Sequence, residues 1–396
     1  MDLFSGLGTY WAGLLASTLL LLQLFSAQAS IYLNTLASSV DQYLVEFTIT
    51  HTSPIPQTSV GSTATDVSTS TPVVTAATST ATTTKKVAAK KPVVAKTTTA
   101  TTSVPKQPLA PIIPPEQVNT LARASIVNIL CISQSGGSVR SISGSGVIID
   151  ARGVILTNAH IGQYFLLRDY PTKNAVDCVV RTGSPATPLY RATLLYLPPA
   201  WINENASQIK AAQGTGTGEN DYALLKISET TNPQGILPAS YTNIAMTAST
   251  PDTGDQALVA GYPAGFLDGL TIERNLYATS AFTTIGTLYT FNDPTHVDVV
   301  SLGGTVVSQG GSSGGAVLRT YDGKLVGLIS TATAGTTTSD RDLRAITIGY
   351  IDRSLREAGK GGIAEILSQD LSTLAADFAA TTFIEEKKKL IDALSN

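Results

Sequence analysis

The run GGSSGGAVLRTYDGKLVGLIS, residues 310–330, sets two adjacent serines among glycines and follows them with two short apolar segments. The segments Ala316–Arg319 and Lys324–Ser330 are rich in Val, Leu and Ile, and the turn residues Tyr321-Asp322-Gly323 separate them, which predicts a β-hairpin. A serine in such a loop is either part of a flexible tip or a nucleophile. The rest of the chain decides between these interpretations.

Short strands are also predicted on both sides of this run. The first group is Ser125–Ile132, Gly146–Asp150, Gly153–Thr157, Cys178–Thr182, Tyr190–Leu197 and Tyr222–Ile227. The second group adds Asp255–Tyr262, Asn275–Phe291, Val297–Val307 and Arg344–Ile351 to the hairpin. Connecting helices are missing from the pattern, so it favours an all-β domain, residues 115–356, with two six-stranded antiparallel barrels or sandwiches at about 115–235 and 250–356.

Composition excludes one class of partner. The chain has 396 residues with 43% hydrophobic and 14% charged residues, which leaves room for a sizeable core. Its net charge is −3 and its pI is near 5.7, so no overall basic field attracts nucleic acid. We therefore expect no nucleic-acid partner.

The N-terminal segment, residues 1–30, is predicted to meet a membrane. No charged residue lies between Leu3 and Val40, and the apolar run extends from Tyr10 to Phe25. This indicates either a signal peptide cleaved after Ala27-Gln28-Ala29 or an uncleaved anchor helix. A buried soluble helix is the third interpretation. The first two predict a location in the cell envelope, with the globular domain outside the cytoplasm, or secretion.

Residues 31–114 are predicted to form a disordered stalk. They are dominated by Thr, Ser, Ala, Pro and Val, with lysines at 85, 86, 90, 91, 96 and 106. Such a segment buries too little apolar surface to offset the entropy of ordering it. The lysines either face solvent or contact an acidic envelope polymer, and the solvated linker is the favoured interpretation.

The histidines discriminate between two nucleophile motifs. Residues 311–315 fit both G-x-S-G-G and the G-x-S-x-G elbow of α/β-hydrolases, which place their histidine after the serine. No histidine follows Ser313, so the elbow is excluded. A hydroxyl nucleophile needs a base and a group that orients the base. His160 ends a predicted hairpin and Asp221 precedes an apolar strand, whereas His51 falls in the stalk and His296 in an exposed turn.

Four phrases in the order His, Asp, Ser resemble the trypsin-like serine proteases, specifically the bacterial HtrA (Deg) branch. They are GSGVIIDARGVILTNAHI, NDYALLKI, GDQALVAGYPAGF and GGSSGGAVLRTYDGKLVGLIS. The resemblance implies two Greek-key β-barrels with a cofactor-free active site between them. It implies that His160 is the general base, Asp221 its orienting carboxylate and Ser313 the nucleophile. It also assigns the oxyanion hole to the backbone N–H groups of Gly311 and Ser313.

The departures from this family carry predictions too. Ser312 stands where the digestive branch has an aspartate, so activity should not need a newly cut N-terminus. The resemblance assigns the specificity pocket to Val307 and to the strand segment Ser330-Thr331-Ala332. No aspartate lies at these positions, so we expect cleavage after small or medium aliphatic residues such as Ala or Val.

The tail, residues 357–396, is too short for the PDZ domain that HtrA enzymes commonly carry. Its apolar residues recur at helical spacing, which predicts one or two amphipathic helices. We expect them to pack on the barrels, with a trimer contact or partner-binding role as the alternative. The sequence does not predict the oligomeric state.

Cys131 and Cys178 fall in strands that can be neighbours in a barrel of this family, so they form either a disulfide, which export permits, or two separate buried thiols. The scattered histidines and cysteines show no metal-ligand spacing, so no metal is predicted.

Together these features predict an exported or membrane-tethered serine endopeptidase that acts on protein or peptide substrates, namely unfolded or envelope proteins. The alternatives are a pseudo-protease that binds peptides without cutting them, and a structural surface protein whose functional part is the stalk.

Overall fold

The structure is a computed structural model of the chain, and it describes residues 112–133, 139–211 and 216–395. All of them belong to one of the two units into which the chain divides. The predicted signal or anchor segment, almost all of the predicted stalk and His51 lie outside the described residues. None of the helices in the described ranges is both long and apolar enough to cross a bilayer.

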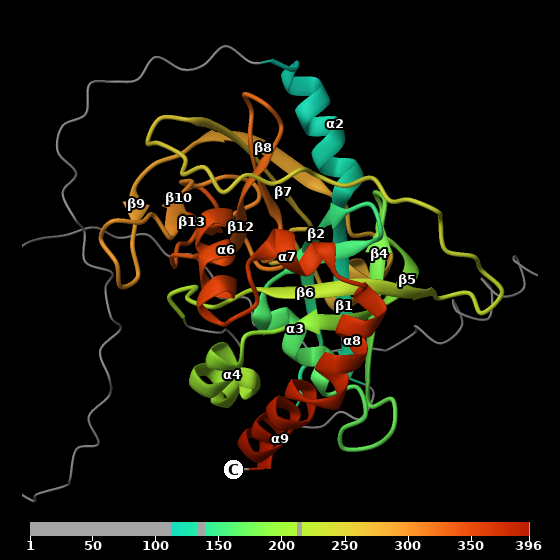
Figure 1. Ribbon diagram of the computed structural model, residues 1–396. Coiled ribbons are helices and arrows are strands. Elements are labelled where there is room, and N and C mark those ends of the chain that lie inside the picture. Colours follow the sequence, from blue (N-terminus) through green and yellow to red (C-terminus); the bar gives the residue numbers. More distant parts are fainter. Residues whose placement is uncertain (1–111, 134–138, 212–215, 396) are drawn as a thin grey trace, which may run out of the picture. The chain divides into compact units, whose positions relative to one another are not determined.

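The N-terminal half of the described chain forms a closed six-stranded antiparallel barrel with the strand order β1-β2-β3-β6-β5-β4 (Figure 1). Its strands are β1 (Ile126–Ser133), β2 (Ile142–Asp150), β3 (Val154–Thr157), β4 (Val176–Thr182), β5 (Thr187–Tyr196) and β6 (Ala223–Thr230). Every neighbouring pair is antiparallel. The first predicted barrel is therefore confirmed.

The C-terminal half forms a seven-stranded sheet instead of a second six-stranded barrel, with the order β8-β7-β11-β12-β13-β10-β9. Its strands are β7 (Gln256–Gly261), β8 (Thr279–Thr284), β9 (Leu288–Tyr289), β10 (Val299–Ser301), β11 (Ala316–Arg319), β12 (Leu325–Ala332) and β13 (Leu343–Thr347).

The extra strand arises because the single strand expected over Asn275–Phe291 is divided. β8 pairs with β7, whereas β9 pairs with β10. Between them the N–H of Ile285 donates to the carbonyl of Asp255 and the N–H of Gly286 donates to the carbonyl of Ser301. The chain changes partners at these two residues, and that exchange ends one strand and allows the next.

Helices in the barrel region are a correction to the all-β prediction. They are α2 (Pro115–Ser125), α3 (Ala159–Leu166), α4 (Pro199–Asn205), the 3₁₀ helix η1 (Ala206–Lys210), α5 (Gly269–Arg274) and α6 (Ile348–Glu357). Helix α6 replaces the end of a predicted strand. The Thr347 hydroxyl accepts a hydrogen bond from the Tyr350 N–H at 3.0 Å and caps the helix there.

The tail forms helices α7 (Ile363–Ser368), α8 (Leu371–Ala380) and α9 (Thr382–Ser395), of which α8 lies against β5 and α9 against α3, α4 and η1 (Figure 1). Phe378, Leu390 and Leu394 are buried in the same hydrophobic cluster as the barrel interior. The tail helices therefore cover the barrel, and α9 packs on the helix that carries His160.

Candidate active site

His160 and Asp221 are brought together by two neighbouring strands. β3 pairs antiparallel with β6, with Thr157 opposite Ala223, so the end of β3 lies beside the start of β6. His160 follows β3 in the first turn of α3, and not at the end of the strand as the sequence indicated. A Cβ on Gly162 would lie 2.7 Å from that of Ala223, so α3 packs closely on β6.

The His160 ring is held by the carboxylate of Asp221. His160 Nδ1 lies 2.9 Å from Asp221 Oδ2 and 3.1 Å from Oδ1, and the His160 backbone N–H donates to Oδ1 at 3.0 Å. An ionised carboxylate only accepts hydrogen bonds, so Nδ1 carries a proton, and in the neutral ring Nε2 then has a free lone pair. This tautomer is the one that a general base needs.

Electrostatics in this pair favour charge separation. Burial, the largest influence, lowers the pKa of His160, but the charge of Asp221 and the hydrogen bond to it outweigh burial and raise that pKa. Burial likewise raises the pKa of Asp221, and the His160 charge and hydrogen bonds from His160 and Ser330 outweigh it, so the pKa is lowered. Asp221 is therefore ionised, although only 4% of its surface is exposed.

Ser330 has a contact that the sequence did not reveal. It was predicted in the specificity pocket, and its hydroxyl donates to Asp221 Oδ2 at 2.8 Å. Its carbonyl accepts a hydrogen bond of 3.3 Å from Ser313 Oγ. Ser330 therefore contacts both the carboxylate and the predicted nucleophile from β12.

The two adjacent serines differ in exposure. Ser312 is buried, and its Oγ has no hydrogen-bond partner among the described residues, whereas Ser313 is half-buried. In the described part of the chain no hydrogen bond joins Ser313 Oγ to His160; the hydroxyl bonds to Ser330 instead. Of the two serines, Ser313 is the one that a substrate can reach.

The backbone of the glycine loop offers two free donors. The Gly310 carbonyl accepts a hydrogen bond of 2.7 Å from the Ala264 N–H. In a trans peptide the carbonyl and the next N–H point in opposite directions, so the Gly311 N–H points away from Ala264. Within the described residues neither the Gly311 N–H nor the Ser313 N–H donates to an acceptor. Both donors are available to an oxyanion.

Only glycine fits at position 311. Its φ is +89°, which lies in the left-handed region. A Cβ there would lie 2.6 Å from the Tyr262 carbonyl oxygen and 2.8 Å from the Ala264 Cβ. The loop can hold its shape because residue 311 has no side chain.

The predicted specificity residues lie beside a residue that the sequence did not single out. Val307 is fully buried, and Thr331 and Ala332 end β12. Near them Arg341 donates at 3.2 Å to the carbonyls of both Ser308 and Gly335, and its guanidinium lies 5.4 Å from the centre of the Phe266 ring. No local pattern marked Arg341, because its partners lie on separate loops.

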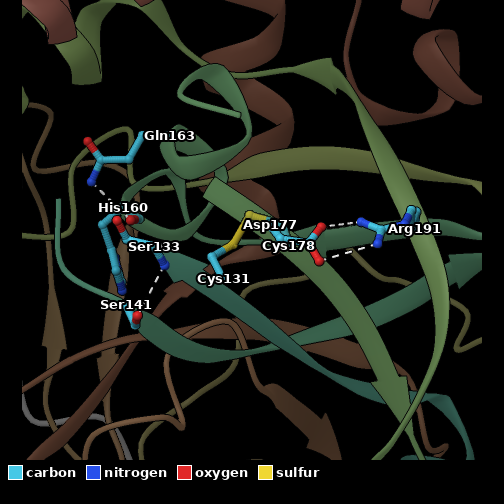
Figure 2. The surroundings of a disulfide bond; sticks show 8 residues. All are labelled: Cys131, Ser133, Ser141, His160, Gln163, Asp177, Cys178 and Arg191. Carbon is cyan, nitrogen blue, oxygen red and sulfur yellow. Dashed lines mark hydrogen bonds and ion pairs between the residues drawn. A yellow bond between two sulfur atoms is a disulfide. The ribbon is translucent and has the colours of Figure 1, made fainter. Parts of the chain in front are cut away.

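Cys131 and Cys178 are joined by a disulfide between directly opposed residues of β1 and β4, whose Cα atoms are 4.0 Å apart. Figure 2 shows this bond with His160 on one side and the ion pair between Asp177 and Arg191 on the other.

His296 is exposed, and its Nδ1 lies 2.9 Å from Asp293 Oδ2. The described residues contain no cluster of His, Cys, Asp or Glu that could hold a metal ion.

Residues 144–328 match the family model of the trypsin-like peptidase domain, a range that includes His160, Asp221 and Ser313. This part of the chain is a trypsin-like peptidase domain, and the chain is a serine endopeptidase. The family inferred from the four phrases is thus confirmed. No curated protein sequence matches the chain.

Several solved structures are similar to this chain. The active form of the Rv3671c protease from M. tuberculosis is 20% identical, with a TM-score of 0.38, over 67% of this chain and 95% of that chain. The HtrA-type protease AlgW with a tripeptide is 19% identical, with a TM-score of 0.39, over 62% of this chain and 65% of that chain. Deg5 is 18% identical, with a TM-score of 0.39, over 61% and 90%.

Proposed function

We propose that Ser313, His160 and Asp221 form the catalytic triad of this endopeptidase. Ser313 Oγ attacks the scissile carbonyl carbon while His160 Nε2 takes the hydroxyl proton. Asp221 stabilises the resulting imidazolium. His160 then passes the proton to the leaving amine, and water hydrolyses the acyl-enzyme by the same route. The observation that carries this proposal is the bifurcated hydrogen bond between His160 Nδ1 and both oxygens of the buried Asp221 carboxylate.

The tetrahedral intermediate needs donors for its oxygen. We assign this role to the N–H groups of Gly311 and Ser313, which have no other acceptor among the described residues. The hydrogen bond between Ala264 and the Gly310 carbonyl supports a donor arrangement formed before substrate binds.

One observation favours a second candidate, a peptide-binding domain that does not cleave. The Ser313 hydroxyl bonds to the Ser330 carbonyl, not to His160. For catalysis the hydroxyl must rotate toward Nε2 when substrate binds. In a pseudo-protease this rotation would not occur.

The place of action and the substrate class follow from sequence features. The uncharged N-terminal run supports export or membrane tethering, with the protease domain outside the cytoplasm, and the Cys131–Cys178 disulfide is compatible with an oxidising compartment. In that setting the substrates are unfolded or envelope proteins.

The residues at the specificity pocket support cleavage after Ala or Val, because Val307 and Ala332 are apolar and no aspartate stands at these positions. Profiling with a peptide library tests this preference. A profile dominated by Arg, Glu or Phe before the cut contradicts it.

The experiment uses the full-length chain, purified in mild detergent, as wild type, Ser313→Ala and Ser312→Ala. Each protein is incubated with a fluorophosphonate probe and with unfolded casein. We expect wild type and Ser312→Ala to be labelled and to cleave casein, and Ser313→Ala to do neither. Labelling that persists in Ser313→Ala contradicts the triad. A folded wild-type protein that is not labelled supports the peptide-binding candidate.

A further inference from the structure

We propose that Ser145, in the N-terminal barrel, is a positioning residue that holds the oxyanion loop, residues 310–315, in its catalytic shape. The inference rests on the proposed function, since it concerns the geometry of that site. Ser145 lies in β2, fully buried, and 166 positions from Gly311 in sequence.

The hydroxyl of Ser145 bridges two loops. It donates to the Gly311 carbonyl at 2.8 Å and accepts from the Tyr262 N–H at 2.8 Å. A hydroxyl can donate and accept at once, which no apolar side chain can do. Without it, the Gly311 carbonyl and the buried Tyr262 N–H lose this partner. The Gly311 carbonyl belongs to the oxyanion loop, and the Tyr262 N–H belongs to the segment that packs against Gly311.

The backbone of Ser145 adds a second hold on the same loop. Its N–H donates to the Ser313 carbonyl at 2.7 Å. Ser145 therefore binds the carbonyls of both Gly311 and Ser313, the two residues whose N–H groups form the proposed oxyanion hole. Within one residue only φ and ψ relate the N–H to the carbonyl. Fixing both carbonyls thus limits how far either N–H can turn.

Strand β2 and the loop are closely packed at Gly314. A Cβ on Gly314 would lie 2.0 Å from the Ser145 carbonyl oxygen and 2.6 Å from Thr157 Oγ1. Thr157 Oγ1 itself donates to that carbonyl at 2.7 Å. Strand β2 therefore packs directly against the loop, so a substitution at Ser145 changes the surroundings of the residues that carry the oxyanion donors.

The test compares three full-length variants with wild type. Ser145→Ala removes the bridging hydroxyl. Ser125→Ala removes another fully buried serine hydroxyl, one without a hydrogen-bond partner in the part of the chain that the structure describes. Thr157→Val removes a buried hydroxyl whose hydrogen bond within the described residues goes to the Ser145 carbonyl and not to Gly311 or Tyr262. The readouts are the fluorophosphonate labelling rate, kcat and KM for a casein-derived peptide, and amide hydrogen exchange of residues 308–316.

For Ser145→Ala we expect kcat and the labelling rate to fall about 10- to 100-fold, less than the roughly 10²- to 10³-fold that follows loss of a whole oxyanion donor. KM should stay within about threefold, because the affected donors act on the transition state. Exchange in residues 308–316 should quicken, since the loop opens more often. Ser125→Ala should match wild type, and Thr157→Val should lose less than Ser145→Ala.

Unchanged kcat and unchanged exchange in Ser145→Ala would overturn the proposal, as would an equal loss in Thr157→Val. If Ser145→Ala does not fold, Ser145→Cys replaces it, because a thiol is a weak donor in the same place and predicts the same direction. The proposed function fails separately, when wild type is not labelled. Hydrogen exchange then still decides whether Ser145 holds the loop.

Discussion

Replacement of Gly311 with alanine is the sharpest test of the preformed oxyanion loop. The new Cβ would lie 2.6 Å from the Tyr262 carbonyl oxygen, 2.8 Å from the Ala264 Cβ and 2.9 Å from the Ala264 nitrogen. Contacts this close force the loop to move. The Ala264 N–H then loses its 2.7 Å hydrogen bond to the Gly310 carbonyl, and the Gly311 N–H turns with the same peptide unit.

The size of the effect follows from what is lost. Loss of one oxyanion donor lowers kcat by about 10²- to 10³-fold, which corresponds to roughly 2.7–4 kcal/mol of transition-state stabilisation. A φ of +89° adds a cost of about 1–2 kcal/mol in folding stability for a residue with a side chain. We therefore expect a large fall in kcat together with a modest fall in the thermal midpoint.

Gly254 provides the matched control. Its φ is +93°, and a Cβ there would meet nothing within 4 Å. Gly254→Ala should therefore show a similar backbone cost without any effect on kcat. The assay is kcat on a peptide substrate and the fluorophosphonate labelling rate, with the thermal midpoint measured in parallel. If Gly311→Ala retains wild-type kcat, or if both variants lose activity equally, the reasoning is refuted.

Three further predictions concern the residues around the site. Asp221→Asn should lower kcat about 10⁴-fold. In the wild type, the acid limb of the kcat/KM profile should lie above the ordinary histidine pKa of 6.5, because Asp221 raises the pKa of His160. In the variant this limb should move to lower pH, because the carboxylate charge is gone and burial lowers the pKa of His160. A limb that does not move would contradict this. Ser330→Ala should lower kcat about 10-fold, since a hydrogen bond to a charged group is worth roughly 1.5–3 kcal/mol; an effect on KM alone would place Ser330 in substrate binding instead. Replacing both Cys131 and Cys178 with serine should lower the free energy of unfolding by about 2–5 kcal/mol, with labelling retained below the midpoint, whereas unchanged unfolding would show that the bond does not stabilise the barrel.

Much of the strand pattern could be predicted from the sequence, because short apolar runs between turn residues are a local signal. The strand predicted at Ala316–Arg319 has the same bounds in the structure. The predicted strand bounds were wrong where the hydrogen-bonding partners of a segment determine where a strand ends. The division of Asn275–Phe291 depends on hydrogen bonds to Asp255 and Ser301, and these partners lie elsewhere in the chain.

Helices were missed for a similar reason. Helix α3 begins one residue before His160, where the apolar run of β3 ends and the chain turns back over the barrel. Ile161 and Leu166 are fully buried against the barrel interior, so the residues of this helix are apolar for the same reason as those of a strand. Their hydrophobicity indicated burial but not which element was buried.

The candidate site was predictable only as far as its motifs are local. The phrases around His160, Asp221 and Ser313 each carry a recognisable pattern. The contact between Ser330 and Asp221 joins residues 109 positions apart, and that between Ser145 and Gly311 joins residues 166 apart. Neither contact can be recognised from the neighbouring sequence, because serines occur in strands for many structural reasons. Such contacts emerge only from the pairing of strands and loops.

The most direct test of the account is to find which residue the fluorophosphonate modifies. Labelled full-length protein would be digested, and the peptide containing residues 308–319 sequenced by mass spectrometry. We expect an adduct on Ser313 alone, because Ser313 is only half-buried whereas Ser312 is buried. An adduct on Ser312, or on a serine outside the loop, would contradict the assignment of the nucleophile.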